Sequence, residues 1–143
     1  MKFLPYSSSL LLLLALTGCS TISGPALYDV LPDTTGQNGR ACVQARDIDG
    51  YGILDNHVMS IDGGRRYYLA TLMPGCNNLS TSSRALFQDR FDDVCGGGMY
   101  KLHSGGDTCA IRQLFEFENR QTAFDAYDAA KARQKELQQK NSD

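Results

Sequence analysis

Short apolar or alternating runs, separated by turn residues, fill the middle of the chain. Between residues 40 and 117 these runs are brief, and glycine, proline and aspartate interrupt them. Such a pattern is typical of a mainly β unit. We expect about six strands, arranged as a small antiparallel barrel or a compact sandwich.

The individual strands follow from the turn signals between them. They are predicted at residues 41–48, 51–54, 57–61, 66–72, 99–103 and 108–117. Asp55-Asn56 separates the second strand from the third, and both side chains tolerate positive φ, so a tight hairpin is expected there. Residues 77–93 suit either a short helix or irregular packing, and both alternatives stay open.

The last predicted hairpin turns at residues 104–107 and has the longest alternating strand. Cys109, Ile111, Phe115 and Phe117 stand an even number of residues apart. Since side chains alternate along a strand, these four are expected to share one face.

After residue 117 the spacing becomes helical. Asn119 is a candidate N-cap, and Phe124, Tyr127 and Ala130 fall on one stripe of a helix. Almost every residue beyond Ala130 is polar, so we expect that half to project into solvent. Residues 40–117 are thus predicted to form the β domain, and residues 118–143 a helix with a polar tail.

The first residues have the pattern of a targeting signal. Lys2 precedes an apolar run at residues 10–16, which is shorter than the ~20 residues that a membrane-spanning helix needs. The run leads directly into Leu16-Thr17-Gly18-Cys19, which matches the lipobox of bacterial lipoproteins. We therefore expect residues 1–18 to be removed as a signal peptide and Cys19 to carry fatty acyl chains such as palmitate.

Lipid on Cys19 would also define the compartment. A processed lipoprotein carries two or three acyl chains, which hold a protein stably on a membrane. Ser20 follows the cysteine instead of an aspartate, and the sorting rule of enteric bacteria then indicates the periplasmic side of the outer membrane. Residues 19–39 are rich in small and polar residues, so a flexible tether is predicted between lipid and domain.

Composition limits the remaining chemistry. The chain has 143 residues, a formal net charge of −2, five cysteines and no tryptophan. Its mild acidity argues against a nucleic-acid surface, which needs clustered basic residues. Cys42, Cys76, Cys95 and Cys109 form an even set in an oxidising compartment, so two disulfides are expected.

The pairing of these cysteines is predicted from the barrel. Barrel closure would place the first and last strands side by side, which favours Cys42 with Cys109. Cys76 with Cys95 would then form a local disulfide that brackets residues 77–93.

No local motif indicates catalysis, a metal or a cofactor. Asp47-Ile48-Asp49-Gly50 begins like a calcium loop, but the later ligand positions do not fit, so a turn is predicted. His57 and His103 lack the spacing of metal ligands. We expect neither an enzyme nor a metal site.

Four tyrosines are candidates for surface contact with a partner: Tyr51, Tyr67, Tyr68 and Tyr100. Tyr67 and Tyr68 are neighbours on a predicted strand and should lie on opposite faces, so one of the two is expected in the core.

The chain resembles an uncharacterised family of short proteobacterial lipoproteins, catalogued as domain of unknown function 6491. The resemblance runs from about Arg40 to Phe117, and the helical tail departs from the family pattern. It rests on Cys42, Ile53-Leu54-Asp55-Asn56, Tyr68-Leu69, Pro74-Gly75-Cys76, Cys95 and Cys109-Ala110-Ile111. It implies the compartment and a small β fold, and it supplies no catalytic residue.

These observations predict a lipid-anchored envelope protein with a non-catalytic binding or structural role. The alternative is a small-barrel inhibitor or binder of a periplasmic envelope enzyme, similar in size and anchoring to periplasmic lysozyme inhibitors. The expected partners are the membrane, through the lipid, and an envelope protein.

Overall fold

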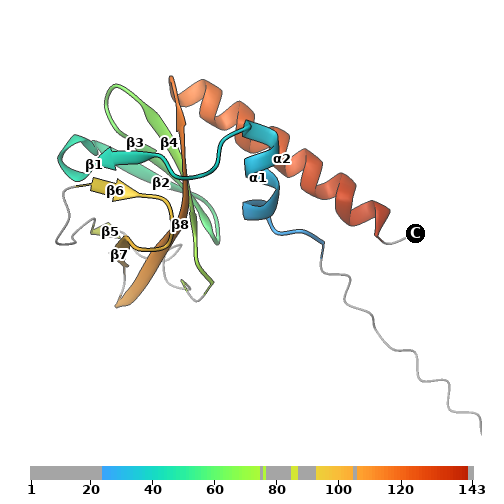
Figure 1. Ribbon diagram of the computed structural model, residues 1–143, viewed down its shortest axis with the longest axis horizontal. Coiled ribbons are helices and arrows are strands. Elements are labelled where there is room, and N and C mark those ends of the chain that lie inside the picture. The colour runs from blue at the N-terminus through green and yellow to red at the C-terminus, as the bar shows by residue number, and fades with distance from the viewer. Residues whose placement is uncertain (1–23, 75, 77–84, 87–92, 105, 142–143) are drawn as a thin grey trace, which may run out of the picture.

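The computed structural model describes residues 24–74, 76, 85–86, 93–104 and 106–141 (Figure 1). Its helices are α1 (Leu27–Thr35), the short 3-10 helix η1 (Ala45–Asp47) and α2 (Arg120–Lys140). Its strands are β1 (Cys42–Gln44), β2 (Gly50–Asp55), β3 (Val58–Asp62), β4 (Tyr67–Leu72), β5 (Ala85–Leu86), β6 (Asp93–Cys95), β7 (Lys101–Ser104) and β8 (Asp107–Phe117).

The strands form two antiparallel sheets. Six strands in the order β2-β3-β4-β8-β7-β5 curve into a half-barrel, and β1 pairs with β6 in a second, two-stranded sheet. The prediction of a mainly β, disulfide-bonded domain with a C-terminal helix is confirmed. Within the described ranges, no helix has both the length and the apolar character that crossing a bilayer requires.

Both predicted hairpins are present, whereas the first predicted strand is too long. β2 and β3 turn at Asn56 and His57, one residue later than expected, and β7 pairs with β8 across the second turn. β1 ends at Gln44, because η1 follows it directly. Most of residues 77–93, left open by the sequence, lie outside the described residues.

Strand β8 contains an extra residue that exchanges its two faces. Thr71 of β4 pairs with Gln113, while the next residue, Leu72, pairs with Ile111, so Arg112 is the additional residue of a β-bulge. Two side chains of β8 that stand an even number of residues apart therefore share a face only if both precede the bulge or both follow it.

The predicted shared face of β8 is accordingly wrong. Cys109 and Ile111 belong to one hydrophobic core, whereas Phe115 and Phe117 belong to another on the opposite face of the sheet. The period of two holds within each half of the strand and fails across Arg112.

The first core lies between the half-barrel and the two-stranded sheet. Val43 of β1 and Val94 of β6 pack there with residues of the larger sheet, among them Ile61, Leu102 and Ile111. The last three side chains are fully buried, so side chains fill the interior of the half-barrel.

The second core places two helices on the other face of the sheet. Leu27, Val30 and Leu31 of α1 pack with Ala123 and Ala130 of α2 over strand residues that include Leu69 and Phe115. The prediction of a tether is therefore wrong for residues 27–35. Leu27, Val30 and Leu31 stand at the i, i+3, i+4 spacing of a buried helix face.

Helix α2 starts as predicted, but its second half is not free. Asn119 Oδ1 accepts a hydrogen bond of 3.0 Å from the Thr122 N–H, which confirms the N-cap. Farther along, Gln134 Nε2 donates to the Pro25 carbonyl at 3.0 Å, and Leu137 packs against the second core. Most side chains of this half are exposed, as predicted, but Gln134 and Leu137 are half-buried because α1, absent from the prediction, supplies a contact surface.

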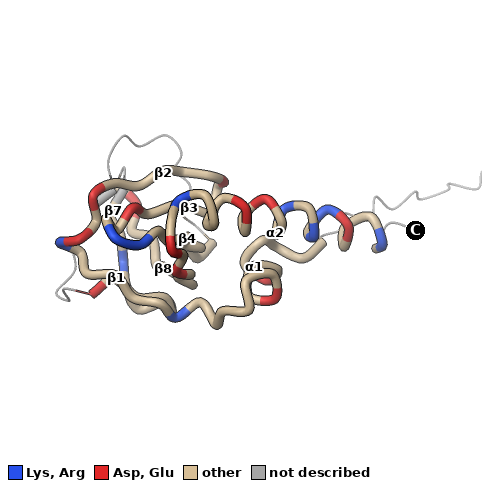
Figure 2. Tube along the Cα trace, turned by 90° about the horizontal axis from the view of Figure 1, so that it is seen from above, with Lys and Arg blue, Asp and Glu red and all other residues tan. Residues whose placement is uncertain are grey.

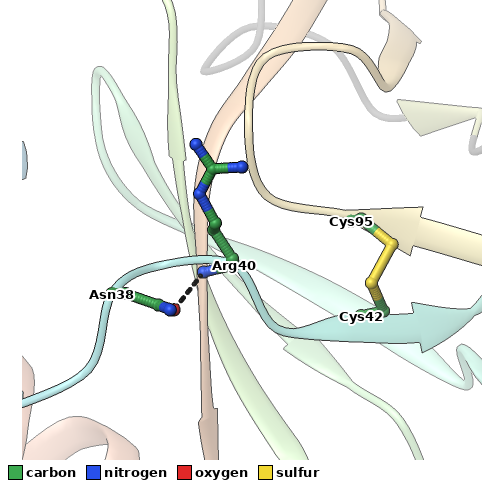
Figure 3. The surroundings of a disulfide bond; sticks show 4 residues. All are labelled: Asn38, Arg40, Cys42 and Cys95. Atoms are coloured by element: carbon green, nitrogen blue, oxygen red, sulfur yellow. Dashed lines mark hydrogen bonds between the residues drawn. A yellow bond between two sulfur atoms is a disulfide. The ribbon is translucent and has the colours of Figure 1, made fainter.

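Two disulfides are present, as predicted, but with a different pairing: Cys42 with Cys95, and Cys76 with Cys109. β1 pairs with β6 instead of β8, which places Cys42 directly opposite Cys95 (Figure 3). Cys76 follows β4, the neighbour of β8, and its Cα lies 5.4 Å from that of Cys109. The predicted pairing failed because it assumed that the first and last strands are neighbours.

Candidate functional site

A polar groove lies between the β1–η1 segment and the turn that joins β3 to β4. Its volume is about 530 Å³, within the ~300–1,000 Å³ range of small-molecule sites. The residues that line it are Val43, Gln44, Arg46, Asp47, Asp49, Gly63, Gly64, Arg65, Arg66 and Tyr68.

One wall is a glycine turn that sits tightly on the floor of the groove. The Gly63 N–H donates to the Arg66 carbonyl at 2.9 Å, and the Gly64 N–H donates to Asp62 Oδ1 at 3.0 Å. A Cβ on Gly63 would lie 2.7 Å from Cε2 of Tyr68. Glycine therefore lets this turn approach the Tyr68 ring, and Arg65 and Arg66 are held at the rim.

The charges of the groove are mixed. Arg46 Nη2 donates to Gln44 Oε1 at 2.6 Å, and Arg66 Nε lies 3.4 Å from Glu116 Oε1. Arg65 makes no ion pair with any other residue that the structure describes. Its exposed guanidinium can thus form a bidentate contact with a carboxylate or phosphate of a partner.

Two aspartates, Asp47 and Asp49, share the groove with the three arginines. Asp47 Oδ1 lies 3.9 Å from Arg46 Nε, and both side chains are largely exposed. An ion pair this exposed contributes little to stability, so these charges remain available to a ligand. The arrangement suits a partner that carries negative groups together with a donor or a positive group.

Tyr68 forms part of the floor, and its side chain is 6% exposed. Burial raises the pKa of its phenol, the Glu116 carboxylate raises it further, and the Arg66 guanidinium opposes the rise. The hydroxyl keeps its proton and is hydrogen-bonded to the Glu116 carboxylate.

Three of the four candidate tyrosines do not form an exposed surface. Tyr67, Tyr68 and Tyr100 are 8%, 6% and 4% exposed, and Tyr51 is half-buried against the first core. Tyr67 and Tyr68 do lie on opposite faces, but both are buried because helices cover one face and the two-stranded sheet the other. The prediction of surface contact is wrong for Tyr67 and Tyr100, and Tyr68 reaches only the groove floor.

The groove was not predicted. Asp47 and Asp49 stand in the predicted turn at residues 47–50, and Arg65 lies between the predicted strands 57–61 and 66–72. No local pattern says that these two segments meet. Within the described part of the chain, no group of three His, Cys, Asp or Glu side chains is placed to hold a metal ion. Cys19 lies outside the described residues, and its lipidation stays a prediction.

A comparison with protein-family models identifies a match to this chain. A model described as a family of unknown function, DUF6491, matches residues 2–140. No curated protein and no solved structure matches the chain. The match includes α2, so the helical segment that departed from the expected pattern lies within the family model.

The raised pKa of Tyr68 predicts a loss of stability in alkali. The folded protein keeps this proton at a pH where the unfolded chain releases it, near the ordinary tyrosine value of 10.0. Its contribution is therefore complete below about pH 10 and is lost as the pH rises through the higher folded-state value. We expect the melting temperature of Tyr68→Phe to fall less steeply above about pH 10 than that of the parent. If the melting temperatures of the two proteins fell equally with rising pH across this range, the assignment would be wrong.

Proposed function

Because the chain belongs to a family of unknown function, DUF6491, we propose a role from its own residues. The protein is a lipid-anchored component of the bacterial cell envelope, and it binds a partner without catalysing a reaction. It is held through Cys19 on the periplasmic side of the outer membrane, and the polar groove is its contact surface.

The arginine-lined groove is the observation that carries this proposal. Arg46 approaches from η1, and Arg65 and Arg66 approach from the β3–β4 turn, so basic groups stand on both walls of one concave surface. Arg65 is exposed and has no ionic partner among the described residues. A partner with carboxylate or phosphate groups fits such a surface.

The compartment is supported by two independent features of the chain. Leu16-Thr17-Gly18-Cys19 follows an apolar run of signal-peptide length, and Ser20 fits delivery to the outer membrane. The disulfides Cys42–Cys95 and Cys76–Cys109 suit an oxidising compartment such as the periplasm.

Anchoring is tested by Cys19→Ser. The variant lacks the thiol that accepts lipid, so it should incorporate no labelled fatty acid and should leave the membrane fraction or accumulate as unprocessed precursor. Growth with radioactive palmitate followed by fractionation measures both effects. Full labelling of the variant would show that the lipid is attached to a residue other than Cys19.

Partner binding is tested with a photoreactive amino acid placed at Arg65 in the groove or, as control, at Lys101. Lys101 is an exposed basic residue of β7 that does not line the groove. Irradiated cells should give a specific adduct from position 65 and none from position 101, and Arg46→Glu should reduce the yield at 65. Equal adducts from both positions would exclude the groove as the contact surface. The identity of the adduct shows whether the partner is an envelope enzyme.

A further inference from the structure

The start of the described chain is fixed against the end of helix α2. Gly24 packs so closely on Gln138 that a Cβ at this position would overlap the glutamine side chain. Next to it, the Pro25 carbonyl accepts a hydrogen bond of 3.0 Å from Gln134 Nε2. The chain therefore leaves the folded domain beside the last turns of α2.

This exit point limits where a lipid on Cys19 can lie. Five peptide units separate Cys19 from Gly24, and a fully extended chain of that length spans at most about 18 Å. The lipidated residue must remain within that distance of Gly24. The C-terminal end of α2 is thus held close to the bilayer, together with the start of α1.

The groove lies at the other end of the molecule. Both views place β1 at one end of the long axis and the end of α2 at the opposite end (Figure 1, Figure 2). α2 has 21 residues and is therefore about 31 Å long, at ~1.5 Å per residue. If the molecule is anchored at the C-terminal end of α2, the length of this helix can separate the groove from the membrane.

The surface of α2 does not favour a position flat on the bilayer. A helix that lies in the membrane interface needs an exposed apolar face, and the apolar stripe of α2 is packed against α1 and the sheet. The large apolar side chains exposed among the described residues are Met73 and Met99, and neither belongs to α2.

The charge along α2 also differs between its ends. Its last ten residues contain four basic side chains, Lys131, Arg133, Lys135 and Lys140, and one acid, Glu136, whereas its first half contains one base, Arg120, and two acids, Asp125 and Asp128. Two of the four bases are in exposed ion pairs, Lys131 with Asp55 and Arg133 with Glu136. A basic side chain is attracted to an anionic lipid surface. Phospholipid headgroups would therefore attract the C-terminal end of the helix more than its start.

We propose that the C-terminal end of α2 rests on the phospholipid headgroups of the membrane that holds Cys19. This inference depends on the lipid anchor of the proposed function. Helix α2 then separates the groove from that membrane, and the groove faces the aqueous space. The ligand of the groove is accordingly a molecule of the periplasmic space and not a lipid of the anchoring membrane.

The absence of tryptophan from the chain allows a direct test, because a single introduced tryptophan reports alone. Gln139→Trp marks the end of α2, Asp125→Trp its first half and Arg65→Trp the groove; all three positions are exposed. Each full-length, acylated variant is reconstituted into vesicles of phosphatidylglycerol and phosphatidylethanolamine, part of which carries a nitroxide on the headgroup. Melting curves confirm that each variant folds like the parent.

Fluorescence loss to the nitroxide should be largest for Gln139→Trp, smaller for Asp125→Trp and smallest for Arg65→Trp. Equal loss at positions 139 and 125 would mean that α2 lies flat, and the largest loss at position 65 would mean that the groove faces the lipid. Either result overturns the proposal. Flotation of the same samples separates this failure from failure of the anchor, since an unanchored protein would not rise with the vesicles and would refute both.

Discussion

The arrangement of the layers depends on a close backbone contact on strand β8. At Leu114 the N–H donates to the Gly39 carbonyl at 2.8 Å, and the carbonyl accepts from the Ala41 N–H at 3.0 Å. The Gly96 N–H in turn donates to the Ala41 carbonyl at 3.1 Å. A Cβ on Gly96 would overlap the Gly39 carbonyl oxygen, so the two-stranded sheet can lie across the half-barrel only with glycine at this position.

The bulge at Arg112 makes this same strand serve both cores. Before the bulge β8 supplies Cys109 and Ile111 to the core beneath the two-stranded sheet, and after it Phe115 to the core beneath the helices. Arg112 also contacts the layers around it: its carbonyl accepts from the Gly97 N–H at 2.9 Å, and its guanidinium lies 4.0 Å from the ring centroid of Tyr28 on α1. Such a cation–π contact contributes about 0.5–2 kcal/mol. One extra residue in one strand therefore couples the helices to the sheet that forms a wall of the groove.

Local signals predicted the features that depend on neighbouring residues, and they missed those that depend on distant pairing. The Asp55 hairpin and the Asn119 cap are formed within a few residues, so the sequence was sufficient for both. The disulfide pairing required knowing that β1 pairs with β6, and the groove required knowing that two turns meet. Helix α1 was missed because its apolar residues are few and lie in a polar segment, where only docking on α2 stabilises them.

The most direct test of the β8 contact is the thermal unfolding of Gly96→Ala beside Gly50→Ala. A methyl group on Gly50 would meet no atom within 4 Å, so its substitution controls for the general effect of replacing a glycine. We expect Gly96→Ala to lower the free energy of unfolding by about 1–3 kcal/mol or more, because the backbone must shift to accept the methyl group, and Gly50→Ala to change it little. Equal melting temperatures for the two variants would contradict the claim that this contact positions the layers.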